Sequence, residues 1–218
     1  MSENDKGFVS KIFGVITSPR RAFQDIEGRD LRTGLLIVFL VAILSAWAGM
    51  TYFSKTELNL LAAGQSGINF EAARSSLTPF IAIGGIVSTF IRWLVPSLLV
   101  LLTAKVLVGE ASSRRMLAMT SFAFLPMVAQ QLLRVIDAMT ISSANLAAFT
   151  ASQVNATGLV GKILNQAIGV FTVFGLLTVL LNTYAVSANY GADTRKSATV
   201  TVAAYLIYVL LRALTEVN

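Results

Sequence analysis

Residues 34–53 read GLLIVFLVAILSAWAGMTYF, a run of twenty residues without a charge. A helix of this length, at about 1.5 Å per residue, is about 30 Å long, which matches the hydrocarbon core of a bilayer. Trp47, Tyr52 and Phe53 stand toward its far end, where aromatic rings favour the boundary between lipid and water. This run predicts a transmembrane helix.

Four more apolar stretches follow the first one along the chain. The second stretch belongs to a block that begins at Pro79, and Gly84-Gly85 could separate an interfacial lead-in from the span itself. The predicted spans cover residues 34–53, 84–108, 116–136, 163–184 and 197–214. The expected fold is therefore all-α, a polytopic transmembrane bundle of five spans that occupies residues 34–218.

Composition excludes much catalytic chemistry. Hydrophobic residues make up 55% of the 218 residues and charged residues 13%, and the chain has no cysteine and no histidine. Disulfides, thiolate nucleophiles, imidazole bases and the usual zinc ligands are therefore unavailable to it. Because we also find no phosphate loop, dinucleotide fingerprint or paired intramembrane carboxylates, we expect no enzyme, cofactor or metal site.

Basic residues favour one face of the membrane. Eleven lie at the N-terminus or in the connections at 105–115 and 195–196, whereas five lie on the opposite side. By the positive-inside rule the N-terminus is cytoplasmic and the C-terminus lies outside. The net charge of +6 therefore indicates topology and contact with anionic lipid, and we expect no nucleic-acid binding.

Residues 1–33 form the expected cytoplasmic amphipathic segment. Apolar residues from Phe8 to Ile16 recur at helical spacing with Lys11 on the opposite, polar side, and Ser18-Pro19 opens a second short helix. Such helices could lie on headgroups, and the alternative is a solvated tail. The residues expected to contact lipid or a partner are Arg20, Arg21, Phe23, Arg114 and Arg115.

The long connections are expected on the outer side. Residues 54–78 carry glycines and both charge signs, which predicts an exposed loop, and residues 137–162 predict a second loop with a possible surface helix at 144–153. Within the spans, Ser45 with Gly49 and Gly84 with Ser88 have the four-residue spacing of small residues that permits close helix packing.

Several polar residues fall at a similar depth in the outer half of the predicted bundle. Arg92 is a lone charge in an apolar block, and such a charge costs at least about 2.5 kcal/mol in hydrocarbon. The expected polar layer comprises Arg92, Gln130, Gln131, Arg134, Asp137 and Arg212, with Asp137 as the nearest counter-ion. Two hypotheses remain open: the layer binds an anionic headgroup or carboxylate, or its arginines extend to the outer headgroups.

The chain resembles the Yip1 domain family in three regions. The first is Ser18-Pro-Arg-Arg-Ala-Phe23, similar to the Ser-Pro-x-x-x-Phe start of prokaryotic members. The second runs from the basic turn at 109–115 into Ser121-Phe-Ala-Phe-Leu-Pro126, and the third is the polar turn at 184–199. The Asp-Leu-Tyr-Gly-Pro motif of eukaryotic trafficking members is absent, which argues against Rab-type GTPase binding.

The resemblance implies a non-enzymatic five-span protein of a prokaryotic cytoplasmic (inner) membrane. Family members act through partners, sometimes beside export machinery or in membrane organisation. The expected partners are the lipid bilayer and a membrane protein or a second copy of the chain. The alternative is a small transporter or an accessory subunit of an export complex, with a polar outer-leaflet site around Arg92.

Overall fold

The computed structural model describes residues 7–55, 70–142, 145 and 159–215, and this part of the chain is helical without any strand. The predicted surface helix at 144–153 lies almost wholly outside the described residues. The elements, in chain order, are α1 (Phe8–Thr17), α2 (Pro19–Gln24), η1 (Gly28–Asp30), α3 (Leu31–Lys55), α4 (Phe70–Leu107), α5 (Ser113–Ala123), α6 (Pro126–Thr140), α8 (Leu159–Val170), α9 (Val173–Tyr190) and α10 (Thr194–Thr215).

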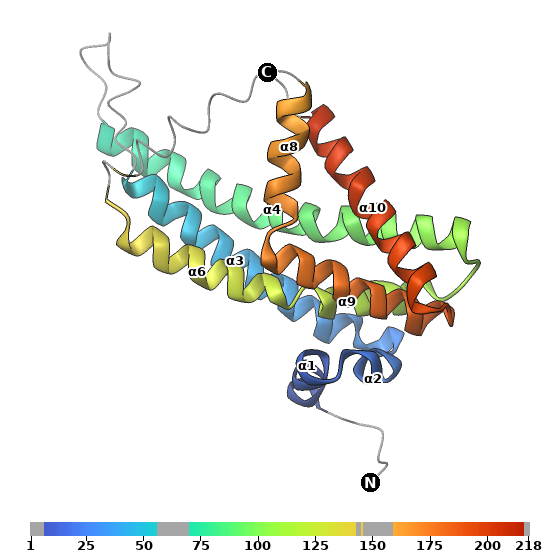
Figure 1. The fold of residues 1–218 in the computed structure, drawn as a ribbon. Helices are drawn as coiled ribbons and strands as arrows, with labels where there is room; N and C mark the ends of the chain where they lie inside the picture. Colours follow the sequence, from blue (N-terminus) through green and yellow to red (C-terminus); the bar gives the residue numbers. More distant parts are fainter. Residues whose placement is uncertain (1–6, 56–69, 143–144, 146–158, 216–218) are drawn as a thin grey trace.

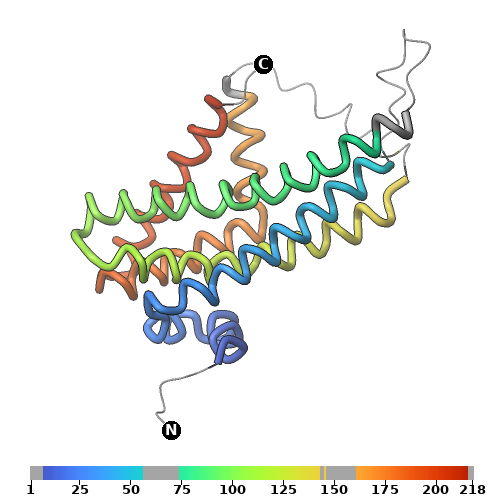
Figure 2. Tube along the Cα trace, turned by 180° about the vertical axis from the view of Figure 1, so that it is seen from behind, coloured from blue at the N-terminus to red at the C-terminus, as the bar shows by residue number. Residues whose placement is uncertain are grey.

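Five segments of the described chain are long and apolar enough to cross a membrane: Gly28–Lys55, Arg74–Leu107, Ser113–Thr140, Val173–Tyr190 and Thr194–Thr215. This confirms the predicted all-α bundle of five spans. In Figures 1 and 2, α3 lies between α4 and α6, α10 crosses α4 obliquely, and α8 leaves the bundle at a steep angle to α9. The helices α1 and α2 lie beside the bundle, near the start of α3.

The second span differs from its prediction. Helix α4 runs without a break from Phe70 to Leu107 and contains both Pro79 and Pro96. Gly84-Gly85 lies inside this helix and does not separate a lead-in from the span, and residues 70–78 are helical rather than part of the predicted loop. A helix of this length exceeds the hydrocarbon thickness, so its first turns extend beyond the apolar core.

The third span has a short interruption. Helix α5 ends at Ala123 and α6 begins at Pro126, whose missing N–H and ring favour the first position of a helix. The structure extends the predicted limits of 116–136 to Ser113–Thr140.

The fourth span differs most from its prediction, because residues 163–184 do not form one continuous helix. The helix is interrupted between Val170 and Val173. There the Thr172 hydroxyl accepts a 3.1 Å hydrogen bond from Gly175 N and caps α9. A Cβ at Gly175 would lie 1.8 Å from the Val170 carbonyl oxygen, so only glycine fits there. The span is therefore Val173–Tyr190, and α8 is a separate apolar helix packed against α10.

Apolar side chains divide between an interior and a surface that faces lipid. The main core is built from α5, α9 and α10 with parts of α4, and it includes Met116, Phe122, Val186 and Val200, all fully buried. Many leucines and isoleucines on the outside of the spans stay exposed, such as Leu206 at 50%. An exposed apolar surface on this scale is expected for helices whose solvent is hydrocarbon.

Helices α3 and α4 pack closely at Gly85. A Cβ there would lie 3.0 Å from the Cα of Ala46, whereas a Cβ at Gly84 would meet nothing within 4 Å. The small residue that permits close approach is thus Gly85, and the predicted role of Gly84 in helix packing is wrong because Gly84 faces away from the described neighbours.

We predict that Gly85→Ala destabilises the folded protein by about 1–3 kcal/mol, because the new methyl group meets the α3 backbone, which cannot move alone. The control is Gly84→Ala, which adds the same methyl group into open space. Thermal unfolding in a mild detergent measures both, and equal unfolding temperatures for the two variants would contradict the packing described here.

Candidate functional site

Residues 8–30 fold back onto the bundle as α1, α2 and η1, and we call this unit the N-terminal cap. Val15, Ala22, Phe23 and Ile26 are buried in the main core, and α2 contacts α9. The ring of Phe8 lies against that of Phe122, with centroids 6.3 Å apart. The cap is therefore packed against the spans and is not a solvated tail.

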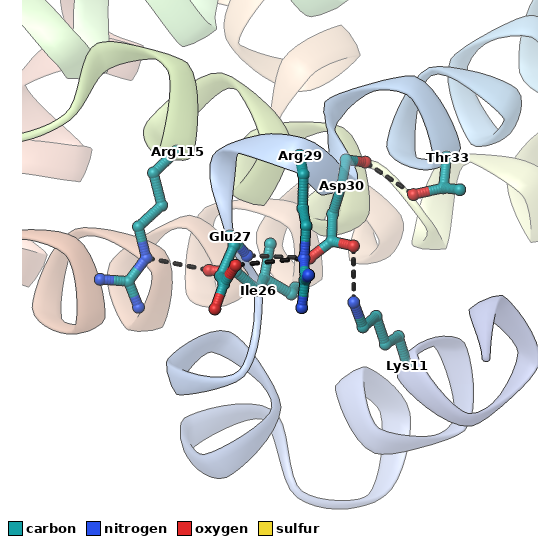
Figure 3. Close-up of polar contacts among 7 residues, drawn as sticks. All are labelled: Lys11, Ile26, Glu27, Arg29, Asp30, Thr33 and Arg115. Carbon is teal, nitrogen blue, oxygen red and sulfur yellow. Dashed lines mark hydrogen bonds and ion pairs between the residues drawn. The ribbon is translucent and has the colours of Figure 1, made fainter. Parts of the chain in front are cut away.

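A buried ion pair fastens the two ends of the cap to each other. The Lys11 ammonium on α1 donates to Asp30 Oδ1 at 2.5 Å, and both side chains are about nine-tenths buried. The other carboxylate oxygen accepts from Glu27 N at 2.9 Å, and the Asp30 carbonyl accepts from the Thr33 hydroxyl at 2.8 Å (Figure 3). Asp30 thus joins α1, η1 and the first turn of α3.

Arg115 joins the cap to the start of the third span. Its Nε donates to the Ile26 carbonyl at 2.9 Å (Figure 3). An Nη of the same guanidinium donates to the Gln24 carbonyl at 3.0 Å. Gln24 is the last residue of α2 and Ile26 lies just past it, where backbone acceptors lack helical partners. The Arg115 guanidinium therefore attaches the cap to the start of α5.

The residues predicted to contact lipid or a partner separate into two groups. Arg20, Arg21 and Arg114 are exposed, as that prediction requires. Phe23 is fully buried, which corrects its predicted contact with lipid or a partner, because its ring is packed inside the main core. Arg115 is half-buried and holds the cap in place.

Helix α1 has two apolar sides instead of the single one expected from its sequence. Phe8, Ile12 and Val15 pack toward the bundle, together with the buried Lys11. Val9, Phe13 and Ile16, spaced at i, i+4 and i+7, are 62–65% exposed on the outer side, and we call them the outer stripe. The expectation that Lys11 lies on the polar side of α1 is wrong because Asp30 draws it inward.

An apolar groove of about 340 Å³ connects the cap to the lipid-facing spans. The cap contributes Val15, Ile16 and Pro19 to its walls. The break of the third span contributes Leu125, Pro126 and Ala129, and α9 contributes Phe174, Leu177, Leu180 and Leu181. Since Ile16 also belongs to the outer stripe, the exposed apolar surface continues from α1 onto α9.

The predicted polar layer lies toward the opposite ends of the spans. Arg92 of α4 and Arg212 of α10 are partly buried, whereas Arg134 of α6 is exposed. The Arg212 guanidinium lies over the Tyr208 ring, 5.9 Å from its centroid.

The other members of the layer are placed as follows. Gln131 is buried and Gln130 is partly buried, and the side-chain oxygen of each has no hydrogen-bond partner in the described chain. Asp137 accepts from the Tyr52 hydroxyl at 2.5 Å and lines the same groove as Arg134, and it forms no ion pair among the described residues. The described residues contain no cluster of three or more acidic side chains that could hold a metal ion.

Sequence reasoning missed Lys11 and Asp30 as a pair and missed the outer stripe. The pairing joins residues nineteen positions apart, and only the folded cap brings them together. The outer stripe had a detectable signal, since six apolar residues on a helix of ten cover more than one face.

We predict that Lys11→Met lowers the free energy that keeps the cap docked on the bundle by about 3 kcal/mol. The substitution leaves the Asp30 carboxylate buried without a counter-ion. In the double variant Lys11→Met, Asp30→Asn, most of the lost docking free energy should be recovered. No buried charge remains, and the amide oxygen of Asn still accepts from Glu27 N.

Limited proteolysis near residues 17–30 measures undocking of the cap. Arg29→Gln is the control because its pair with Glu27 is exposed and contributes little; equal protease sensitivity of the two single variants contradicts the role of the buried pair.

Comparison with known proteins adds one finding. A family model of the Yip1 domain matches residues 13–214, which include most of the cap and all five spans. Neither the curated proteins nor the solved structures give a significant match. The family is generally one of non-enzymatic membrane proteins. Because the match covers nearly the whole chain and the structure supplies the five apolar helices, this multi-pass integral membrane protein belongs to the Yip1 domain family.

Proposed function

We propose that the chain is a non-enzymatic interaction or scaffold protein that acts through lipid or protein partners in membrane organisation or export. The observation that carries this proposal is the N-terminal cap. A buried ion pair and two arginine hydrogen bonds hold it in one position on the spans. Its outer surface presents Arg20 and Arg21 beside the outer stripe, and a surface held rigid loses less entropy when a partner binds.

We further propose that the cap lies in the cytoplasm of a prokaryote, at the inner membrane, with the C-terminus outside. Lys105 lies in the last turn of α4, Arg114 in the first turn of α5, and Arg195 and Lys196 in the first turn of α10. The basic connections therefore gather at the end of the bundle that holds the cap (Figure 1). The positive-inside rule favours the cytoplasm for such an end. A membrane protein or a second copy of this chain is the expected protein partner.

The outer stripe supports contact between the cap and the membrane. Val9, Phe13 and Ile16 continue through the apolar groove onto α9, whose Leu177 and Leu180 are exposed as lipid-facing residues. A helix lying in the plane of the interface buries such a stripe at the boundary between headgroups and acyl chains. In this position Arg20 and Arg21 would face the anionic headgroups.

The depth of α1 in the membrane can be tested directly because the chain has no cysteine. We predict that a spin label at Phe13→Cys, in vesicles of phosphatidylglycerol and phosphatidylethanolamine, is relaxed more by oxygen than by a water-soluble nickel chelate. Ser10→Cys, exposed one residue beyond Val9, is the control and should favour the chelate. Equal chelate accessibility at the two positions would place α1 in water and remove lipid contact from the proposal.

A transporter or an accessory subunit of an export complex is the second candidate, and the position of Arg92 inside the apolar helix α4 favours it. The two functions require different ends of the bundle. A scaffold depends on the surface of the cap, whereas a conduit depends on a path for water and solute past Arg92.

We predict that Arg20→Glu combined with Arg21→Glu abolishes complementation of a strain that lacks this chain. Both residues are exposed, so the free energy of unfolding should change by less than about 0.5 kcal/mol for each substitution. Arg195→Glu, an exposed base at the same end of the bundle but outside the cap, should complement normally. Full complementation by the cap variant, with loss of complementation in Arg92→Gln, would reject the scaffold function and favour the conduit.

A further inference from the structure

One wall of the apolar groove belongs to the N-terminal cap, and the other walls belong to the spans. The cap supplies Val15, Ile16 and Pro19, while the break of the third span and α9 supply the rest. A cap that left the bundle would take its wall with it. The groove therefore exists only while the cap is docked, and any ligand of the groove binds the docked state alone.

The lining of the groove indicates the chemistry of its ligand. Every side chain that lines it is apolar. A polar ligand would lose its hydrogen bonds with water there and find no side chain to replace them. Water is disfavoured for the same reason, because a stable water site needs at least two polar partners. The lining therefore favours a hydrocarbon ligand.

The surroundings of the groove indicate the source of this hydrocarbon. Leu177 and Leu180 on the α9 side and Ile16 on the cap side are exposed, whereas Val15 and Leu181 are buried and form the deeper part. The groove thus opens onto the lipid-facing surface of the spans. Lipid tails are the solvent of that surface, so a partner protein would have to displace an acyl chain to enter.

We propose that the apolar groove binds one acyl chain of a bilayer phospholipid, and that the bound chain holds the N-terminal cap in its docked position. A ligand that binds one of two states stabilises that state by mass action. Since the acyl chain contacts the cap and the spans together, its binding favours docking and its loss favours release. This control deepens the proposed function, because it rests on the contact between the cap and lipid.

The test measures cap docking by limited proteolysis near residues 17–30 of the full chain, in a detergent that has a rigid steroid body in place of a flexible tail. Dioleoyl phosphatidylglycerol and dioleoyl phosphatidylcholine should both slow cleavage. At a lipid concentration about ten times Kd, the undocked population and the rate of cleavage should each fall about tenfold. Glycerophosphoglycerol, a headgroup without acyl chains, should have no effect.

Two variants separate the groove from the outer stripe. Ile16 and Val9 both belong to the stripe and are similarly exposed, but only Ile16 lines the groove. Ile16→Ser should weaken the affinity for either phospholipid about fivefold, because part of an apolar contact is lost. Val9→Ser should leave this affinity unchanged. Both substitutions replace exposed side chains, so both variants should fold.

A third variant fills the groove from within the protein. Ala129→Phe places a ring where the acyl chain would lie, so the cap should resist cleavage without lipid, and added lipid should change the rate little. The control is Ile136→Phe, at an exposed position of the same helix outside the groove, which should respond to lipid as the unmodified chain does.

Three results would overturn the proposal: no protection by either phospholipid, equal protection by glycerophosphoglycerol, or equal loss of lipid affinity in Ile16→Ser and Val9→Ser. In the last case the outer stripe alone would carry the lipid contact, and the proposed function would stand. A dimer in lipid-free detergent that Ala129→Phe dissociates would show that a second copy occupies the groove. Conversely, lipid protection with the Phe13→Cys label in water would reject membrane contact by the stripe and leave the groove as the lipid site.

Discussion

The structure depends on one constraint, which is that hydrocarbon cannot form hydrogen bonds with the backbone. Each span must satisfy its N–H and C=O groups internally, and a helix does this within a single segment. Hydroxyl groups within the spans obey the same constraint: the Thr89, Ser97 and Thr201 side chains each donate to a carbonyl one turn earlier. The amide of Asn182, buried in α9, donates both to the Thr178 carbonyl and to the Tyr205 hydroxyl of α10.

The same constraint explains how the two interrupted spans are tolerated. At the first break Pro126 supplies no N–H that would need a partner, and turn hydrogen bonds continue through Phe124 and Leu125. At the second break the Thr172 hydroxyl accepts from Gly175 N, and the side-chain-free Gly175 lets the Val170 carbonyl approach. The break redirects the chain so that α8 packs on α10, and it creates the groove that Arg134 and Gln130 line.

Charged side chains are held differently at the two ends of the bundle. At the cap, each buried charge has a protein partner: Lys11 has Asp30, and Arg115 has two carbonyls. Toward the other end, Arg92 stands in the apolar helix α4, and the Arg212 guanidinium lies over the Tyr208 ring. The arrangement at the cap fixes a surface in place.

The sequence alone determined the helical class and the five spans, because helical rise and hydropathy depend only on residues that are near in sequence. The start of α4, the break at Val170–Val173 and the burial of Phe23 could not be read in this way. The burial of Phe23 depends on residues distant in sequence, because the cap packs against α9. The break depends on the close approach of the Val170 carbonyl to Gly175, which helical periodicity does not indicate. Only the tertiary structure decided that Lys11 turns inward, because its partner Asp30 becomes a neighbour only after the cap has folded back onto the spans.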